Sequence, residues 1–277
     1  MKLTVLGSGN AVPTKHRSSS AYLLEATDLH FLIDCGSGTL RRLLEHEYHL
    51  GGINHILLTH THPDHVSDLV PLLHAKFVWE LFAKAMKAES PMNEYPIDLI
   101  GPRGFETVVR TIANVTDPSM LAGERVSTFQ VQFTEVTNTA LKRGAVSIQT
   151  VQTEAGEQNY PPSVAYLITD QGKRILFTGD VRRTEEIVAL ATAGRVGDQI
   201  PGVDVLVIDC TGGTDMPPGG HLNPPYVAQA ALDMGAKKVI LTHLSEFILH
   251  DEDLVQSVKS AFRGAVILAR DGLKLEL

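Results

Sequence analysis

Short apolar runs rich in β-branched residues recur along the chain and alternate with segments of helical spacing. The apolar runs predict buried strands over residues 3–6, 22–24, 31–33, 55–58, 146–151, 164–168, 175–177, 203–208 and 238–241. Helical spacing covers residues 39–48, 66–88, 104–114, 184–193, 224–234 and 252–262. Strands and helices interleaved in both halves indicate an α/β protein whose helices cover the faces of its sheets.

The composition narrows the class of protein further. A chain of 277 residues, 43% hydrophobic and 20% charged, can bury a full core, and no linker or repeat divides it, so we expect one domain over residues 1–277. A net charge of −8 argues against a general basic surface for nucleic acid. The two cysteines cannot form a disulfide framework, and no apolar run is long enough for a membrane span. We therefore expect a soluble, cytoplasmic protein without a membrane partner.

The segment at about residues 76–124 fits this pattern least well. It begins with the aromatic cluster Phe77, Trp79 and Phe82 and continues through a stretch broken by Pro91 and Pro96. The favoured interpretation is a core-packing helix followed by a surface loop, because aromatic clusters are usually buried. The alternative is an insert that caps a cleft or forms a homodimer surface.

A group of potential metal ligands follows the apolar strand that ends at residue 58. It consists of three histidines and one aspartate: His60, His62, Asp64 and His65. In an extended chain His60 and His62 point to the same side, and Pro63 ends the strand so that the next two ligands turn back as a helix begins at Val66. Imidazole with carboxylate suits Zn, Mn or Fe. Four ligands in one turn exceed the needs of a single tetrahedral ion, so we expect one or two divalent ions, with zinc or manganese favoured.

This motif resembles the His-x-His-x-Asp-His signature of the metallo-β-lactamase superfamily. Two further strand ends, Phe177-Thr178-Gly179-Asp180 and Leu241-Thr242-His243, are similar to the positions of its bridging aspartate and last histidine. The N-terminal LGSGNAVPTKHRSSSAYLL resembles the ribonuclease Z-like and phosphodiesterase branch. The resemblance implies a four-layer αβ/βα sandwich of two mixed sheets flanked by helices. It also implies six metal ligands: His60, His62, Asp64, His65, Asp180 and His243.

A further histidine separates the branches of this superfamily. The segment Gly220-His221-Leu222-Asn223-Pro224 precedes a predicted helix and the strand that ends at His243. It resembles the segment in which phosphodiester-cleaving members carry an additional histidine that binds no metal. The resemblance therefore implies that His221 is catalytic, protonating the leaving oxygen, and that Asp64 also orients or deprotonates the attacking water.

One position departs from the family pattern. Members carry a metal histidine about midway along the chain, and the matching position here is Asn159. The ion held by His60 and His62 then lacks an imidazole, unless Asn159, Glu154 or Glu157 supplies an oxygen. We expect this site to be weaker, selective for an oxygen-preferring ion, or empty.

Together these features predict a metal-dependent hydrolase that cleaves phosphodiester bonds with hydroxide held by the ions. The runner-up is a ribonuclease Z-type RNA endonuclease, and lactone or ester hydrolysis comes third. Residues 160–179 leave no room for the long arm with which many ribonuclease Z enzymes grip transfer RNA, so a smaller phosphodiester is favoured over RNA. A metal-poor, degenerate member that acts as a binding protein is the alternative from another class. Asp34, at a strand end, is expected to support a ligand histidine.

Overall fold

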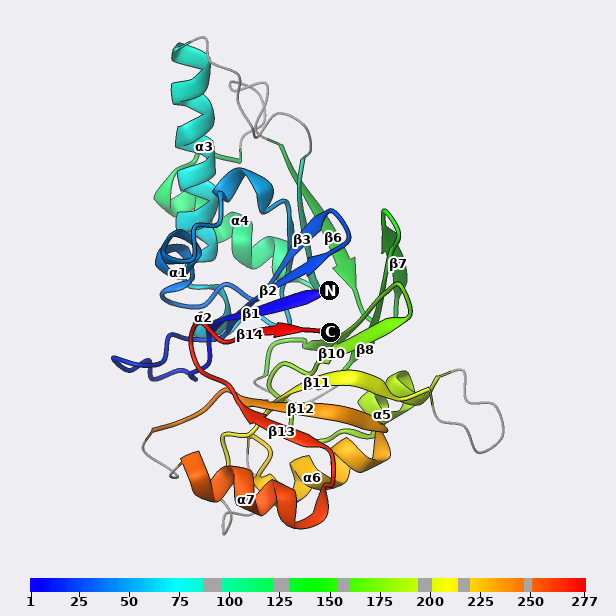
Figure 1. Ribbon diagram of the computed structural model, residues 1–277. Helices are drawn as coiled ribbons and strands as arrows, with labels where there is room; N and C mark the ends of the chain where they lie inside the picture. The colour runs from blue at the N-terminus through cyan, green and yellow to red at the C-terminus, as the bar shows by residue number, and fades with distance from the viewer. Residues whose placement is uncertain (87–95, 122–129, 154–159, 194–200, 214–219, 247–250) are drawn as a thin grey trace.

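Most strands carry apolar side chains on both of their faces, so each sheet must be covered on both sides. The computed structural model satisfies this with two stacked sheets and an outer layer of helices on each (Figure 1). It describes residues 1–86, 96–121, 130–153, 160–193, 201–213, 220–246 and 251–277. The predicted four-layer α/β sandwich with two mixed sheets is confirmed.

The first sheet comes from the N-terminal half and the last strand, in the order β14-β1-β2-β3-β4-β5-β6. Pairing is antiparallel from β14 to β3 and parallel from β3 to β6. Its strands are β1 (Lys2–Gly7), β2 (Ala21–Ala26), β3 (Leu29–Ile33), β4 (His55–Leu57), β5 (Ile97–Pro102), β6 (Val131–Val136) and β14 (Lys274–Glu276). The helices of this half are α1 (Thr39–Glu45), the 3-10 turn η1 (Leu50–Gly52), α2 (Pro63–Val66), α3 (Leu69–Ala85) and α4 (Phe105–Thr116).

The second sheet has the order β13-β12-β11-β10-β9-β8-β7. It is parallel from β13 to β10 and antiparallel from β10 to β7. Its strands are β7 (Ala140–Arg143), β8 (Val146–Gln152), β9 (Val164–Asp170), β10 (Lys173–Phe177), β11 (Val203–Asp209), β12 (Ala236–Thr242) and β13 (Ala265–Leu268). The helices are α5 (Glu185–Thr192), α6 (Pro224–Asp233) and α7 (Asp251–Ala261).

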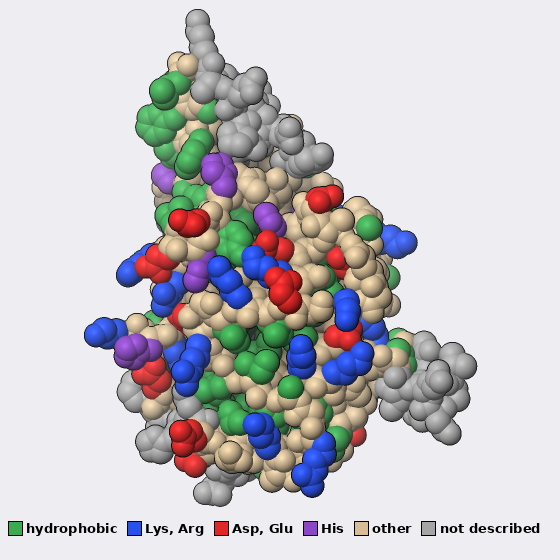
Figure 2. Space-filling model, in the orientation of Figure 1, with side chains coloured by type: hydrophobic (Ala, Val, Ile, Leu, Met, Phe, Trp, Pro, Cys, Tyr) green, Lys and Arg blue, Asp and Glu red, His purple; other side chains and the backbone are tan. Residues whose placement is uncertain are grey.

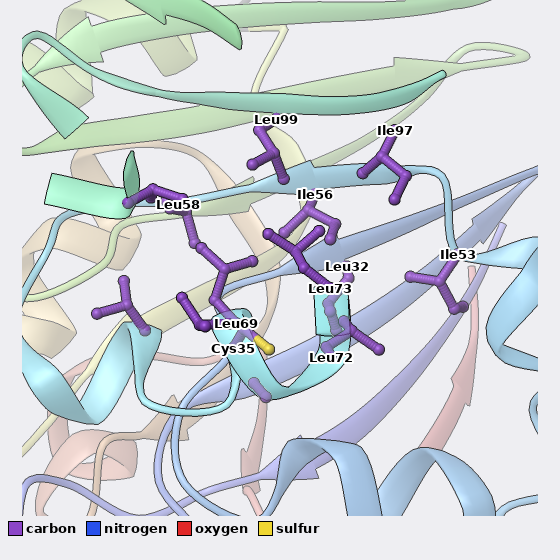
Figure 3. Close-up of a cluster of buried hydrophobic side chains, with 14 of the residues drawn as sticks. Leu32, Cys35, Ile53, Ile56, Leu58, Leu69, Leu72, Leu73, Ile97 and Leu99 are labelled. Atoms are coloured by element: carbon purple, nitrogen blue, oxygen red, sulfur yellow. The ribbon is translucent and has the colours of Figure 1, made fainter. Parts of the chain in front are cut away.

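Three apolar clusters hold the layers together. One lies between the first sheet and its helices, where Figure 3 shows Leu32 and Ile56 of the sheet gathered with Leu69 and Leu73 of α3. A second joins the other sheet to α5, α6 and α7. The third fills the space between the sheets, and there the buried Tyr166 donates a hydrogen bond to the carbonyl of Leu58 at 2.8 Å. Each fully buried Leu or Ile contributes roughly 1.5–3 kcal/mol.

Several elements differ from their predicted extents. The helix expected from Val66 begins instead at Pro63 and is interrupted before α3 starts at Leu69. Residues 76–124 contain a central strand, β5, and the helix α4, as well as the end of α3. Their additional role as a cap or homodimer surface stays a prediction.

The far end of α3 carries exposed apolar side chains. Trp79, Phe82 and Met86 are 44%, 64% and 77% exposed, and Figure 2 shows hydrophobic side chains gathered over the upper part of the molecule where α3 lies. Among the helices of the described residues, none combines the length and the apolar character that crossing a bilayer demands.

Candidate metal centre

The predicted ligands meet where strands of both sheets end. Residues 60–65 follow β4, Asp180 follows β10, and His243 follows β12. His62 is the N-cap of α2, and Pro63 occupies the first turn, where a missing N–H costs nothing. This turn brings Asp64 and His65 back toward the side of His60. The turn therefore acts as predicted, although the helix begins earlier than expected.

One cluster contains Asp64, His65, Asp180 and His243, whose ligand atoms all lie within 4.8 Å of one another. His65 Nε2 and His243 Nε2 lie 3.2 and 3.3 Å from Asp180 Oδ1. His243 Nε2 also lies 3.1 Å from Asp64 Oδ2. Two imidazoles and two carboxylates form a complete donor set for one divalent ion.

A second cluster contains His60, His62 and Asp180. His60 Nε2 lies 3.0 Å from His62 Nδ1 and 3.7 Å from Asp180 Oδ2. Because Asp180 turns one oxygen toward each cluster, it is placed to bridge two ions. The described residues supply this cluster with three ligands.

Hydrogen bonds at Nδ1 orient three of the histidines. His65 Nδ1 lies 2.8 Å from Asp34 Oδ2, so Asp34 contacts a histidine of the motif, as predicted. His60 Nδ1 lies 3.1 Å from Thr59 Oγ1, and His243 Nδ1 lies 2.7 Å from Thr211 Oγ1. With Nδ1 assigned as donor, each Nε2 presents a lone pair to the cluster. His65 Nε2 is buried without a hydrogen-bond partner, which fits a metal ligand.

Burial and charge shift the pKa values of these groups in opposite directions. Burial and the neighbouring His65 hold the pKa of His60 well below its usual value. Burial also opposes protonation of His243, but the charge of Asp180 and hydrogen bonds to Asp209 and Asp64 raise its pKa to about 10. Burial disfavours the charged form of Asp64, yet the hydrogen bond from His243 lowers its pKa to about 2. A dication would take the place of the histidine protons, because ligand imidazoles must be neutral.

His221 lies beside the first cluster, with its ring stacked on His243 at a centroid distance of 5.0 Å. Its Nδ1 is 2.8 Å from Asp209 Oδ2. The other oxygen, Asp209 Oδ1, accepts from the backbone N–H and hydroxyl of Thr211. Asp180, Asp209, His221 and His243 also lie close enough together to hold an ion. Because both oxygens of Asp209 already accept hydrogen bonds, we assign this carboxylate to orienting His221 and Thr211. Burial opposes the positive charge on His221, but Asp209 raises its pKa above the usual value.

Close backbone packing fixes the chain around the clusters. Gly179 has φ of 63°, and a Cβ there would lie 2.8 Å from Cβ of Thr59, so only glycine allows Asp180 to approach this strand end. Asp34 and His243 also have positive φ, 58° and 57°. Non-glycine residues in this region cost about 1–3 kcal/mol and tend to occur at functional sites.

The Beta-lactamase superfamily domain model matches residues 30–244 of the chain. The chain belongs to this family. A Ribonuclease Z from Haloarcula marismortui is 27% identical over 321 residues, covering 99% of this chain and 96% of that protein. The Probable metallo-hydrolase YhfI of Bacillus subtilis is 26% identical over 280 residues, with both chains covered in full.

Solved structures agree with the membership in the β-lactamase superfamily. The crystal structure of YhfI has a TM-score of 0.77 at 22% identity and covers 99% of each chain. A diphosphatase from the PhnP family has a TM-score of 0.67 at 20% identity, with 100% of this chain and 97% of that one covered. At these identities the structures show a common fold. The chain is thus a metallo-β-lactamase-fold hydrolase with a His and Asp cluster able to hold metal.

In this superfamily member the clusters open into a cavity of about 230 Å³. Its lining includes His60, His62, Asp64, Asp180, His221 and His243, together with Tyr160 and Arg182. Asn159, Glu154 and Glu157, expected to replace the missing histidine, lie outside the described residues. Asp209 and Thr211 are not among the residues predicted from the sequence. The signal that could have found them is the strand end Val-Ile-Asp209, which repeats the strand-end acid of Leu-Ile-Asp34.

Proposed function

We propose that the protein is a metal-dependent phosphodiesterase. The observation that carries the proposal is the pairing of His221 with Asp209 beside the metal-ligand clusters, within the same cavity. His221 is oriented by Asp209 without being one of the proposed metal ligands, so it can act on the substrate. In the cleavage of an alkyl phosphodiester it would supply the proton that the leaving oxygen must gain.

The ligand roles follow from the two clusters. Asp64, His65 and His243 would hold one ion and His60 and His62 the other, with Asp180 available to both. When bound, divalent ions lower the pKa of water at the site and offset the charge that grows on the phosphoryl oxygens. Zinc and manganese suit these donors.

The protein groups then move the protons. Asp64 orients the attacking water and accepts its proton. His221, with its Nδ1 held by Asp209, donates the proton on Nε2 to the leaving oxygen. Asp209 keeps the ring in position and compensates its charge.

Two observations favour a small phosphodiester over RNA as substrate. The net charge is −8, and no long arm is present in residues 160–179. The ribonuclease Z relatives keep an RNA endonuclease as the second candidate, which oligoribonucleotide substrates test directly.

Substitution of His221 tests the proposal. With a methyl phosphodiester whose leaving group is an aliphatic alcohol, His221→Ala should lower kcat by about 10²–10⁴-fold, the range typical of general acids, while the metal content per chain stays unchanged. The loss should be smaller with methyl 4-nitrophenyl phosphate, because 4-nitrophenolate leaves with little need of a proton. His46→Ala is a matched control, because His46 lies outside the cavity and should retain full activity. Equal turnover of the aliphatic diester by wild type and His221→Ala would contradict the role of His221 as proton donor.

Metal analysis of the same preparations tests the clusters. We expect a tightly bound ion in the cluster of Asp64, His65 and His243, and a weaker, oxygen-preferring or vacant site at His60 and His62. Two tightly held zinc ions per chain would contradict the weaker site. A wild-type protein that binds no metal and cleaves no phosphodiester would instead support the alternative of a degenerate binding protein.

A further inference from the structure

Tyr160 lies at the opening of the cavity, on the side of the second cluster. Its ring centroid is 6.1 Å from that of His62, and the residue both lines the cavity and remains 42% exposed. At its other end, a Cβ added to Gly220 would lie 3.3 Å from the Tyr160 hydroxyl oxygen. The side chain thus extends from His62 to the residue before His221. A substrate that reaches both must pass this ring.

Arg182 packs against the Tyr160 ring. Its guanidinium carbon lies 4.3 Å from the Tyr160 ring centroid, within the distance of a cation–π contact. Arg182 follows Asp180 by two residues, and both line the same cavity. Because Asp180 is fixed by contacts to the histidines, Arg182 ties the ring to the rigid part of the site.

The cavity beside the Tyr160 ring is small. The cavity measures about 230 Å³, whereas pockets for drug-sized ligands span about 300–1,000 Å³. A phosphoryl group with one small ester substituent fits this space. A nucleoside on the side of Tyr160 would meet the ring. The cavity therefore restricts the size of the group that does not leave.

We propose that Tyr160, held in place by Arg182, is the size selector of the site and restricts it to phosphodiesters whose retained ester group is small. This inference rests on the proposed phosphodiesterase function and specifies its substrate class. Tyr160 and Arg182 are positioning residues in this account, and His221 and Asp64 carry the proton transfers.

Two substrates with the same leaving group test the selector. Methyl 4-nitrophenyl phosphate has a small retained group, and thymidine 5′-(4-nitrophenyl phosphate) has a large one. Both release 4-nitrophenolate, so their comparison isolates the retained group. The readout is the ratio of kcat/KM for the thymidyl ester to kcat/KM for the methyl ester, with the metal content of each variant measured alongside.

We expect Tyr160→Ala to raise this ratio at least about tenfold, the scale on which a pocket wall discriminates substrates by size. Tyr160→Phe should keep the wild-type ratio, since it retains the ring. Arg182→Met should raise the ratio by a smaller factor, because the ring loses its support. Arg183→Met is the matched control, since this exposed neighbour does not line the cavity, and it should leave the ratio unchanged.

The outcomes separate the two levels of the proposal. If the ratio of kcat/KM values in Tyr160→Ala equals that of wild type, as it would after a proportional loss on both substrates, Tyr160 is not the size selector. A shift in Tyr160→Phe as large as in Tyr160→Ala would also overturn it, because the hydroxyl and not the ring would then decide. If wild type cleaves neither diester, the phosphodiesterase proposal fails, and the selector inference fails with it.

Discussion

At the scale of single residues, the candidate site depends on Asp34, a buried carboxylate on the Nδ1 side of His65. Asp34 accepts hydrogen bonds from the backbone N–H and hydroxyl of Thr59 as well as from His65. Asp34 therefore fixes the orientation of the His65 ring. It also holds Thr59, the residue that precedes His60. Such supporting partners commonly contribute 10–100-fold to metal affinity.

Asp34→Asn should accordingly weaken the ion of the Asp64, His65 and His243 cluster by about 10–100-fold. The substitution keeps the size of the side chain and removes the charge that stabilises the His65 N–H donor. Competition with a chromogenic chelator measures the affinity. Asp28→Asn, at an exposed turn residue, is the control. Equal affinities in the two variants would argue against a supporting role for Asp34.

A second prediction for a single residue concerns the replacement of Gly179. Gly179→Ala and Gly172→Ala both place a side chain at positive φ, of 63° and 76°, and so share a backbone cost of about 1–2 kcal/mol. Only the Cβ at residue 179 meets a neighbour, Thr59, whereas nothing lies within 4 Å at residue 172. We expect the free energy of unfolding to fall in both variants, and further in Gly179→Ala because of the contact with Thr59, whereas bound metal and activity should be lost only in Gly179→Ala. Full metal content in both variants would contradict this role of Gly179.

Much of the site was predictable because its ligands are close in sequence or follow apolar strands. His60, His62, Asp64 and His65 form one motif, and the strands before Asp180 and His243 were evident from their β-branched residues. Asp209 was missed because its role depends on a neighbour, His221, that only the fold brings within reach. Sequence spacing does not encode such a contact.

At the scale of elements, an ion pair joins the two sheets near their far edges. Arg143 on β7 donates to both oxygens of Asp98 on β5, at 2.5 and 3.0 Å. Burial opposes the charge of Asp98, but hydrogen bonds from His55 and Arg143 lower its pKa below the usual value. The pair therefore favours the folded state wherever Asp98 is ionised.

Asp98→Asn should lower the free energy of unfolding by about 1.5–3 kcal/mol at pH 7, the range for hydrogen bonds to charged groups. Because the pKa is lower in the folded state, the stabilisation is complete above the ordinary aspartate pKa and is lost as the pH falls through the lowered value. Urea unfolding between pH 7 and pH 3 should show wild type and Asp98→Asn converging toward acid. Arg143→Met should cost a similar amount at pH 7. A difference that is constant over this pH range would exclude an ionic contribution.

Five strands were not predicted, for two physical reasons. β6, β7, β13 and β14 lie at sheet edges, and most of their residues are exposed or half-buried, so they lack the continuous apolar run of a buried strand. β5 is fully buried, yet its sequence Ile-Asp-Leu-Ile-Gly-Pro contains an aspartate that pairs across the sheets and ends at a proline. The long apolar strands were predicted because their neighbours on both faces require that composition.

At the scale of the whole molecule, the proposed ligands come from both halves of the chain. His60, His62, Asp64 and His65 follow a strand of the first sheet, whereas Asp180 and His243 follow strands of the second. Bound metal would therefore connect the two sheets, and binding that occurs only in the folded state raises stability by mass action.

Removal of metal with a chelator should lower the Tm of wild type, and adding the divalent ion back should restore it. An ion at 100 times its dissociation constant stabilises by about 2.7 kcal/mol. His221→Ala should show the same shift, since His221 is not a proposed ligand, while His65→Ala should show a smaller one. Differential scanning calorimetry measures all three. Equal shifts in His65→Ala and wild type would exclude His65 as a ligand.

The last strand gives the molecule a property unrelated to catalysis. β14 leaves the second half and pairs antiparallel with β1, placing Glu276 opposite Lys2, and both chain ends lie side by side (Figure 1). Neighbouring ends tolerate a new covalent link. A short glycine-rich linker could join them, and the chain could be reopened at the exposed turn of Asp28 between β2 and β3. The resulting circular permutant would keep every strand in register while moving β1 and β2 from the start of the chain to its end.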